Sequence, residues 1–239
     1  MMDKVILVAS GKGGTGKTFF ASNAGAIFAE RGNRVLLIDM DMGLRNLDIS
    51  LGLENKVIYD IVDVVTGVCK IKQAIIKDRH FNCLYLMSAS QNRDKGEINK
   101  ENMKDLCEKL CTKFDYVIID CPPGIGKGLA LAASVASKGI IITVPEYAAI
   151  RDADMLDRTL IEMGVQDRSY VVNKINMDMM AGGLIPNLDQ ISQILRPKIA
   201  GTIQYDNNIH IATNNGLPIV SKKGTYIEKN FNNIIDRIV

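Results

Sequence analysis

The chain has 239 residues, of which 47% are hydrophobic and 23% are charged, and these proportions are ordinary for a folded globular protein. Lysine and arginine exceed aspartate and glutamate by only two, so the net charge gives no strong reason to expect a nucleic-acid partner. The five cysteines form no CxxC pair, which argues against a zinc site and a disulfide framework.

The N-terminus lacks a signal-peptide pattern, and every apolar segment is too short to be a transmembrane span. We therefore expect a cytoplasmic protein. With no linker-like stretch and no internal repeat, residues 1–239 are predicted to form one domain.

A glycine-rich loop, Ser10-Gly11-Lys12-Gly13-Gly14-Thr15-Gly16-Lys17-Thr18, follows the first apolar run and matches G-x-x-x-x-G-K-[ST]. The run before it, residues 4–9, predicts a buried strand, and residues 18–31 carry apolar side chains at helical spacing. Strand, glycine loop and helix in this order are typical of a phosphate-binding loop. Lys17 is expected to reach the terminal phosphates and the Thr18 hydroxyl to bind Mg²⁺. The predicted nucleotide contacts in this segment are Gly11, Lys12, Gly13, Gly14, Thr15, Gly16, Lys17, Thr18 and Phe19.

The second predicted strand, residues 34–39, ends on Asp39, with Asp41 two residues further on. Ligands of open parallel sheets bind beyond the carboxyl ends of the strands, so these carboxylates are placed to reach Mg²⁺ and the attacking water. Capping of a turn or helix is the alternative role for both aspartates. The preceding phosphate-binding loop favours the functional interpretation.

The middle of the chain is predicted to hold short elements and then a further strand that ends in a carboxylate. We predict helical pieces over residues 59–66 and 69–77, a strand over 84–87, a polar loop over 91–96 and an amphipathic helix over 99–112.

Four apolar positions ending in an acid make the strand Tyr116–Asp120 a Walker B element, whose carboxylate holds a Mg²⁺-bound water. The stiff loop Cys121–Gly126 behind it would carry the Gly124 N–H toward the γ-phosphate and shift when that phosphate leaves.

The C-terminal half continues the alternation of helices and strands. Here we predict a helix over 129–136, a strand over 139–144, a helix from about 150 to 163, a strand over 169–174, a surface loop over 176–187, a strand over 199–203 and a final helix over 226–239. Such alternation implies an α/β fold of three layers, in which a mostly parallel sheet carries helices on both faces.

Three motifs identify a family resemblance that covers essentially the whole chain. The loop K-G-G-T-G-K-T, with its early Lys12, resembles the deviant Walker A loop of the MinD/ParA superfamily of dimerising ATPases. The run D-x-D-x-G-L-R-N-L-D from Asp39 to Asp48 is similar to the MinD branch, as is P-E…R-D-A-D after Pro145. Partition proteins of the ParA branch usually carry a D-P-Q type sequence where this chain has the first of these runs.

By this resemblance, Lys12 reaches across a dimer interface to the partner's nucleotide, whereas a solvated surface lysine is the alternative. Asp41 orients the attacking water, and Asp39 and Asp120 support the metal. Residues 45–48 belong to a switch region near that interface. The resemblance also implies two contacts to adenine, made by Asn173 and Asp206.

The resemblance implies that ATP with Mg²⁺ brings two subunits face to face and that hydrolysis to ADP separates them. The expected function is an ATP-driven dimerisation switch that positions a cellular assembly, above all the division septum, with a protein activator or cargo adaptor as partner.

Three alternatives stay open at this point. A ParA-like partition ATPase is opposed by the near-neutral charge and the G-L-R-N-L-D run. An iron–sulfur carrier is favoured by the P-P-G-x-G loop from Pro122 and opposed by the missing CxxC pair. A static scaffold that no longer hydrolyses ATP is opposed by the retention of Asp39, Asp41 and Asp120.

The final predicted helix bears on membrane binding. MinD relatives usually continue beyond this helix into a short basic amphipathic segment. In this chain the apolar stripe from Ile227 to Ile238 is expected to dock on the core, and Lys222 and Lys223 are too few for a polybasic anchor. We therefore expect no intrinsic membrane anchor here, with recruitment to the membrane periphery through a partner or a removed tail.

Overall fold

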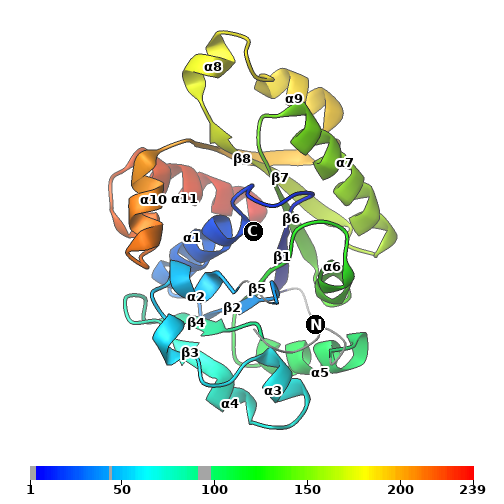
Figure 1. Ribbon diagram of the computed structural model, residues 1–239, viewed down its shortest axis with the longest axis vertical. Helices are drawn as coiled ribbons and strands as arrows, with labels where there is room; N and C mark the ends of the chain where they lie inside the picture. Colours follow the sequence, from blue (N-terminus) through cyan, green and yellow to red (C-terminus); the bar gives the residue numbers. More distant parts are fainter. Residues whose placement is uncertain (1–3, 43–44, 91–97) are drawn as a thin grey trace.

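The computed structural model describes residues 4–42, 45–90 and 98–239, and its middle layer is one sheet (Figure 1). In this described part of the chain the sheet has eight strands in the order β3-β4-β2-β5-β1-β6-β7-β8. All neighbouring strands pair in parallel except β3, which is antiparallel to β4 at one edge. The strands are β1 Val5–Ala9, β2 Val35–Asp39, β3 Ile75–Lys77, β4 Leu84–Met87, β5 Tyr116–Asp120, β6 Lys138–Thr143, β7 Asp167–Ile175 and β8 Lys198–Gln204.

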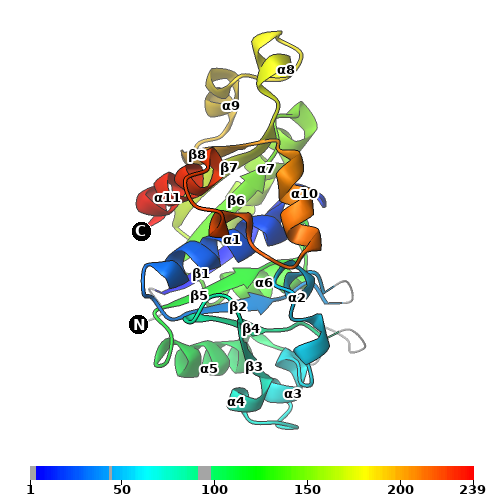
Figure 2. The ribbon, with the colours of Figure 1, turned by 90° about the vertical axis from the view of Figure 1, so that its left-hand side faces the viewer.

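Helices cover both faces of this sheet, as the two views in Figures 1 and 2 show. One core cluster lies under α1 (Lys17–Glu30), α2 (Leu47–Ser50) and α11 (Tyr226–Ile238). The other lies under α3 (Ile61–Val65), α5 (Lys100–Cys111), α6 (Lys127–Ala133), α7 (Tyr147–Glu162) and α9 (Leu188–Ile194). The remaining helices are α4 Ile71–Ala74, α8 Met177–Ala181 and α10 Asn207–Asn214, with 3-10 turns at Glu54–Lys56 and Ile219–Ser221.

Strand β1 shows why this architecture follows from the sequence. Val5 and Leu7 pack into the core under α5 and α7, whereas Ile6 and Val8 pack into the core under α1 and α11. A strand buried on both faces reads as a continuous apolar run, because successive side chains point to opposite sides. The prediction of an α/β fold with three layers is confirmed.

Two predictions of local structure are wrong. Residues 75–77, expected to be helical, form β3, because Ile75 and Ile76 pair with Met87 and Leu86 of β4. The expected loop over 176–187 contains α8, which Asn176 caps by accepting a hydrogen bond from the Met179 N–H. The polar loop predicted over 91–96 lies outside the described residues.

The final helix docks on the core, as its sequence pattern indicates. In α11, Ile227, Phe231, Ile234, Ile235 and Ile238 are buried, and Phe231 stacks on Phe20 of α1 with ring centroids 5.7 Å apart. In the described residues, no helix combines the length and apolarity that crossing a bilayer requires.

Candidate active site

The phosphate-binding loop connects β1 to α1 and is closed by its own side chains. Gly14 and Gly16 have φ values of +77° and +99°, in the left-handed region that favours glycine. The Ser10 hydroxyl donates to the Lys12 carbonyl at 2.7 Å and accepts from the Lys17 ammonium at 3.0 Å. Lys17 is only 7% exposed, so its charge is held at the base of the loop, in the place where phosphate would be bound.

Two carboxylates lie beside this loop at the ends of neighbouring strands. Asp39 of β2 and Asp120 of β5 are register partners, and both are 1% exposed. The Thr18 hydroxyl donates to Asp120 Oδ2 at 2.6 Å. The second oxygen, Asp120 Oδ1, is buried and has no hydrogen-bond partner. A buried carboxylate oxygen normally has a partner. The unpaired Asp120 Oδ1 therefore marks a place for a cation that is coordinated by oxygen atoms.

Burial and, after it, the neighbouring Asp39 carboxylate raise the pKa of Asp120 to about 8. Burial is also the main cause that raises the pKa of Asp39 to about 6. Two acids with raised pKa values and a hydroxyl form a hard-oxygen donor set, which suits Mg²⁺. Within the described residues no group of three or more His, Cys, Asp or Glu side chains is arranged for a metal. Mg²⁺ takes six oxygen ligands, so two carboxylates and a hydroxyl leave positions that phosphate and water oxygens would fill.

A cavity of about 400 Å³ opens above these groups and has the chemistry of a phosphate site. Lys17 and Thr18 line it from the loop, and Asp41 and Pro123 line it from the segments after β2 and β5. Asp41 therefore faces the same space as the residues expected to bind phosphate and metal, as its predicted role requires. Gly13, Gly14, Gly16 and Phe19 also line this cavity.

An adjoining cavity of about 190 Å³ has the position expected for a base. It shares Gly16, Phe19 and Thr213 with the phosphate cavity, so the two are continuous. Asn173, which is 3% exposed, lines it and donates from its amide to the Thr15 carbonyl at 2.8 Å. In this structure the Asn173 amide thus holds the loop in place while it borders the base cavity.

Lys174 is a site residue that sequence reasoning missed. Its ammonium donates to the Gly14 carbonyl at 2.8 Å, and its φ of 57° is left-handed, which is uncommon for a lysine. It lies within β7, next to Asn173, and lines the base cavity. The signal available in the sequence was its place directly after Asn173 at the carboxyl end of a predicted strand.

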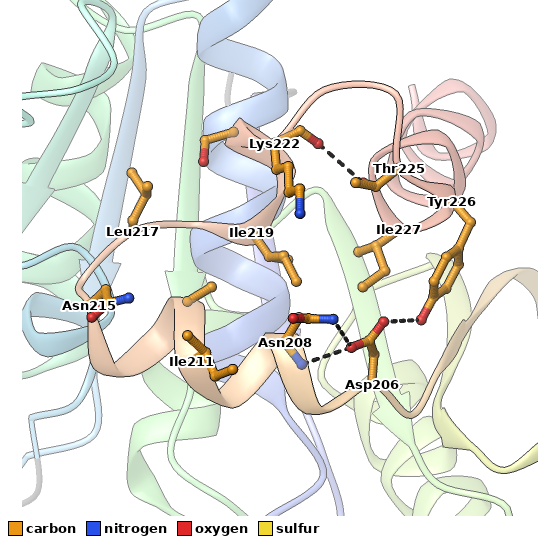
Figure 3. A pocket seen from close by; sticks show the side chains of 12 residues that line it. Asp206, Asn208, Ile211, Asn215, Leu217, Ile219, Lys222, Thr225, Tyr226 and Ile227 are labelled. Carbon is orange, nitrogen blue, oxygen red and sulfur yellow. Dashed lines mark hydrogen bonds between the residues drawn. The ribbon is translucent and has the colours of Figure 1, made fainter.

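Asp206 lies on the wall between the base cavity and a further cavity of about 450 Å³ on the other side of α10. Figure 3 shows its carboxylate directed toward Asn208 and Tyr226. It caps α10 by accepting from the Asn208 N–H at 2.7 Å, and it accepts from the Tyr226 hydroxyl at 2.7 Å. The carboxylate is therefore engaged in capping, and its contact with adenine stays a prediction.

Two predicted residues make other contacts in this structure. Lys12 forms an ion pair with Glu146, its Nζ lying 2.6 Å from Glu146 Oε2, and both side chains are exposed at 38% and 60%. The Gly124 N–H donates to the Ser10 carbonyl at 2.9 Å and has to leave it to meet a phosphate. The structure thus does not bring Lys12 together with Lys17, and the roles predicted for Lys12 and Gly124 stay predictions.

The segment predicted to be a switch is attached directly to the metal site. Asp39 accepts from the Asp41 N–H at 2.8 Å through one oxygen and from the Leu47 N–H at 3.2 Å through the other. Arg45, with a φ of 39°, pairs with the buried Asp48, its Nε lying 2.7 Å from Oδ2. Gly43 and Leu44 of the same motif lie outside the described residues. Asp39 is therefore joined to the described part of this segment by the hydrogen bond from the Leu47 N–H.

Comparisons with known proteins agree with this geometry. A family model described as an AAA domain matches residues 3–173. The chain is 43% identical over 240 residues to the septum site-determining protein MinD of Bacillus subtilis, covering 100% of this chain and 90% of that protein. The structure matches a chain of the MinC:MinD cell division complex of Aquifex aeolicus with a TM-score of 0.91 at 36% identity, covering 98% and 95% of the two chains. A putative plasmid partition protein of Borrelia burgdorferi, at 20% identity, a TM-score of 0.78 and 98% and 97% coverage, shares the fold alone.

Proposed function

Since this chain belongs to the MinD family of septum site-determining P-loop ATPases, we propose that its two joined cavities bind ATP with Mg²⁺ and that bound ATP assembles a homodimer. The chain is an ATPase that acts as a dimerisation switch in septum-site placement. The finer steps proposed below rest on its own residues. The partition ATPase and the iron–sulfur carrier are not favoured, because two MinD proteins are 43% and 42% identical to this chain over 100% and 93% of its length.

The unpaired, buried oxygen of Asp120 is the observation that carries the nucleotide and metal proposal. The other oxygen of Asp120 accepts from the Thr18 hydroxyl, and Asp120 pairs in register with Asp39; burial is the main cause that raises the pKa of both acids. Mg²⁺ bound there would offset part of the negative charge of the two carboxylates and of the bound phosphates. Thr18, Asp39 and Asp120 would hold it directly or through water.

Hydrolysis then requires a water molecule aimed at the γ-phosphorus and stabilisation of the charge that develops. Asp41 lines the phosphate cavity together with Lys17, so its carboxylate can accept a hydrogen bond from that water and orient it. Lys17 is poised on Ser10 and would exchange this neutral hydroxyl for phosphate oxygens. The exchange favours the ionic partner, because hydrogen bonds between charged groups are the stronger ones.

The dimer proposal rests on Lys12. Its present partner, Glu146, is exposed, and an exposed ion pair contributes only about 0.2–1 kcal/mol. Exchanging Glu146 for the phosphates of a facing subunit therefore costs little and gains a multiply charged partner. The Leu47 N–H donates to Asp39, and this bond supports the proposal that the switch segment also changes its contacts when the dimer forms.

The partner class follows from the relative in complex with MinC. We propose that a protein of this kind binds the ATP-bound dimer of this chain and that the chain is cytoplasmic, reaching its site of action through partners.

Replacing Lys17 by Ala tests the site. Removing one such charged group from a transition-state clamp lowers turnover by about 100-fold or more. Phosphate release in the presence of Mg-ATP measures the effect, and Lys229→Ala on the exposed side of α11 is the matched control. A Lys17→Ala protein that hydrolyses ATP at the wild-type rate would show that the site is misassigned.

A further inference from the structure

A groove separate from the nucleotide cavities lies between α5 and the α3–α4 segment, which occupy the lower part of Figure 1. Its volume is about 500 Å³. Four lysines line it from two sides: Lys70 and Lys72 from α4 and its N-cap, Lys109 from α5, and Lys113 just beyond α5. We refer to it as the lysine groove.

The lysine groove has a higher net positive charge than the whole chain. The groove has one acidic side chain, Asp105, so it carries a net charge of +3 while the whole chain carries +2. The residues outside the lining therefore sum to a net charge of −1 (+2 less +3), and the groove is a local surplus of positive charge. Two further acids lie near its lining, because burial and then Asp63 and Asp60 raise the pKa of the Cys69 thiol. Among the described residues, none of the four lysines has an ion pair or a side-chain hydrogen bond to an acid. Clustered cations of this kind repel one another and favour an anionic ligand.

The floor of the lysine groove is apolar. Val64, Val65 and Ile71 are half-buried, and Leu106 is buried beneath them. On α5 the lining residues Asn102, Asp105, Leu106 and Lys109 recur at helical spacing, so one face of the helix forms one wall, which Lys113 extends just beyond its end. An apolar floor between two cationic rims fits a ligand that is itself amphipathic, with apolar groups flanked by carboxylates.

The shape and the side chains of the lysine groove favour one class of anionic partner over the others. A bilayer needs a convex or flat apolar surface, whereas here the apolar groups lie recessed below the lysines. Single-stranded nucleic acid is bound on aromatic platforms, and no aromatic residue or arginine lines this groove. A helix from a protein fits, because it inserts an apolar stripe and leaves its polar sides at the rims.

We propose that the lysine groove docks an acidic amphipathic helix of a partner protein. The groove lies at α3, α4 and α5, whereas both nucleotide cavities are formed by the loop, α10 and the carboxyl ends of the strands. The lysine groove shares no lining residue with either nucleotide cavity, and the proposal does not depend on the roles assigned to the nucleotide site.

Fluorescence anisotropy with a defined peptide tests the proposal. The probe is a labelled 18-residue helix with leucine at i, i+3, i+4 and i+7 positions and glutamate on its flanks, and its control has the same composition in scrambled order. The groove variant is Lys72→Glu with Lys109→Glu. The matched variant is Lys100→Glu with Lys104→Glu, which changes the net charge equally on the part of α5 outside the groove.

We expect the groove variant to weaken binding of the amphipathic probe at least tenfold, the matched variant to change it less than twofold, and the scrambled peptide to bind more weakly than the probe. Basal ATP hydrolysis and the thermal midpoint should be unchanged in both variants, which excludes misfolding as the cause. Equal losses in the two variants, or no loss in the groove variant, would overturn the proposal. It would also be overturned if vesicles of phosphatidylglycerol or a single-stranded oligonucleotide, not the probe, bound with this dependence on the groove lysines.

Discussion

Asp39 and Asp120 are the residues at which folding and function conflict most. Both are buried acids in register on adjacent strands. Burial is the main cause that raises the pKa of each, and the Asp39 carboxylate adds to the rise at Asp120. Such a pair costs stability as long as no cation lies between the two carboxylates. The unpaired oxygen of Asp120 indicates that this cost is retained for binding a metal.

The sign of this effect predicts how nucleotide-free protein responds to pH. A raised pKa means that the folded state binds the proton more tightly than the unfolded state. The stability that protonated Asp120 contributes is therefore complete below its ordinary pKa of 3.8 and is lost as pH rises through about 8. In Asp120→Asn the side chain is uncharged throughout. We expect this variant to exceed the wild type in free energy of unfolding by more than about 1 kcal/mol at pH 8.5, the equivalent of one pKa unit.

Urea unfolding at pH 4.5, 6.5 and 8.5 without nucleotide measures this difference, which should shrink toward acid pH. Exposed Asp178→Asn is the control and should follow the wild type at every pH. Adding Mg-ADP should stabilise the wild type more than ADP with EDTA does, and Asp120→Asn should lose that increment. A variant that is less stable than the wild type at pH 8.5 would contradict the assignment of a strained carboxylate.

At the scale of elements, the sequence predicts those strands, loops and helices whose pattern lies in residues that are neighbours in the chain. The strand before the glycine loop, the loop itself and the acid-terminated β5 are local patterns, and all were located correctly. The edge strand β3 was missed because only pairing with β4 distinguishes Ile75 and Ile76 from helical residues. The bond from Asn173 to the Thr15 carbonyl joins residues 158 apart in the chain, so no local signal reports it. The same holds for Lys174, whose contact with Gly14 exists only once β7 lies beside the loop.

Helix α11 gives the prediction at this scale. Its strong apolar stripe resembles that of an interfacial helix, yet all five stripe residues are buried against α1, β8 and the turn at Ile219–Ser221. The expectation that α11 is not a lipid anchor rests on this burial and stays a prediction. Phe231→Ala should lower the free energy of unfolding by about 3–5 kcal/mol, because it leaves a cavity beside two phenylalanine rings.

Urea unfolding checks this value, with Lys229→Ala on the exposed side of the same helix as the control. A loss below about 1 kcal/mol for Phe231→Ala would mean that α11 is only loosely attached and that its stripe is available to another surface.

At the scale of the whole molecule, the fold brings most of the predicted nucleotide-site residues together, whereas Lys12 is paired elsewhere. Lys17, Thr18, Asp39, Asp41 and Asp120 converge on the phosphate cavity or its metal site, whereas Lys12 is paired with Glu146 at the start of α7. A residue that serves the facing subunit has no reason to enter its own cavity. We therefore propose that Asp41 serves hydrolysis and that Lys12 serves assembly.

This division yields opposite outcomes for two single substitutions. Asp41→Ala removes the carboxylate expected to orient water but leaves Lys17, Thr18 and the metal acids in place, so the protein should bind Mg-ATP, fail to hydrolyse it and accumulate as a dimer. Lys12→Ala keeps the intrasubunit site and loses the crossing charge, so it should bind Mg-ATP and remain monomeric. Light scattering after gel filtration in Mg-ATP measures both masses, with Lys104→Ala on α5 as a surface control that behaves as the wild type. A monomeric Asp41→Ala protein that still binds ATP would remove Asp41 from its proposed role, and a dimeric Lys12→Ala protein would show that the lysine does not act across the interface.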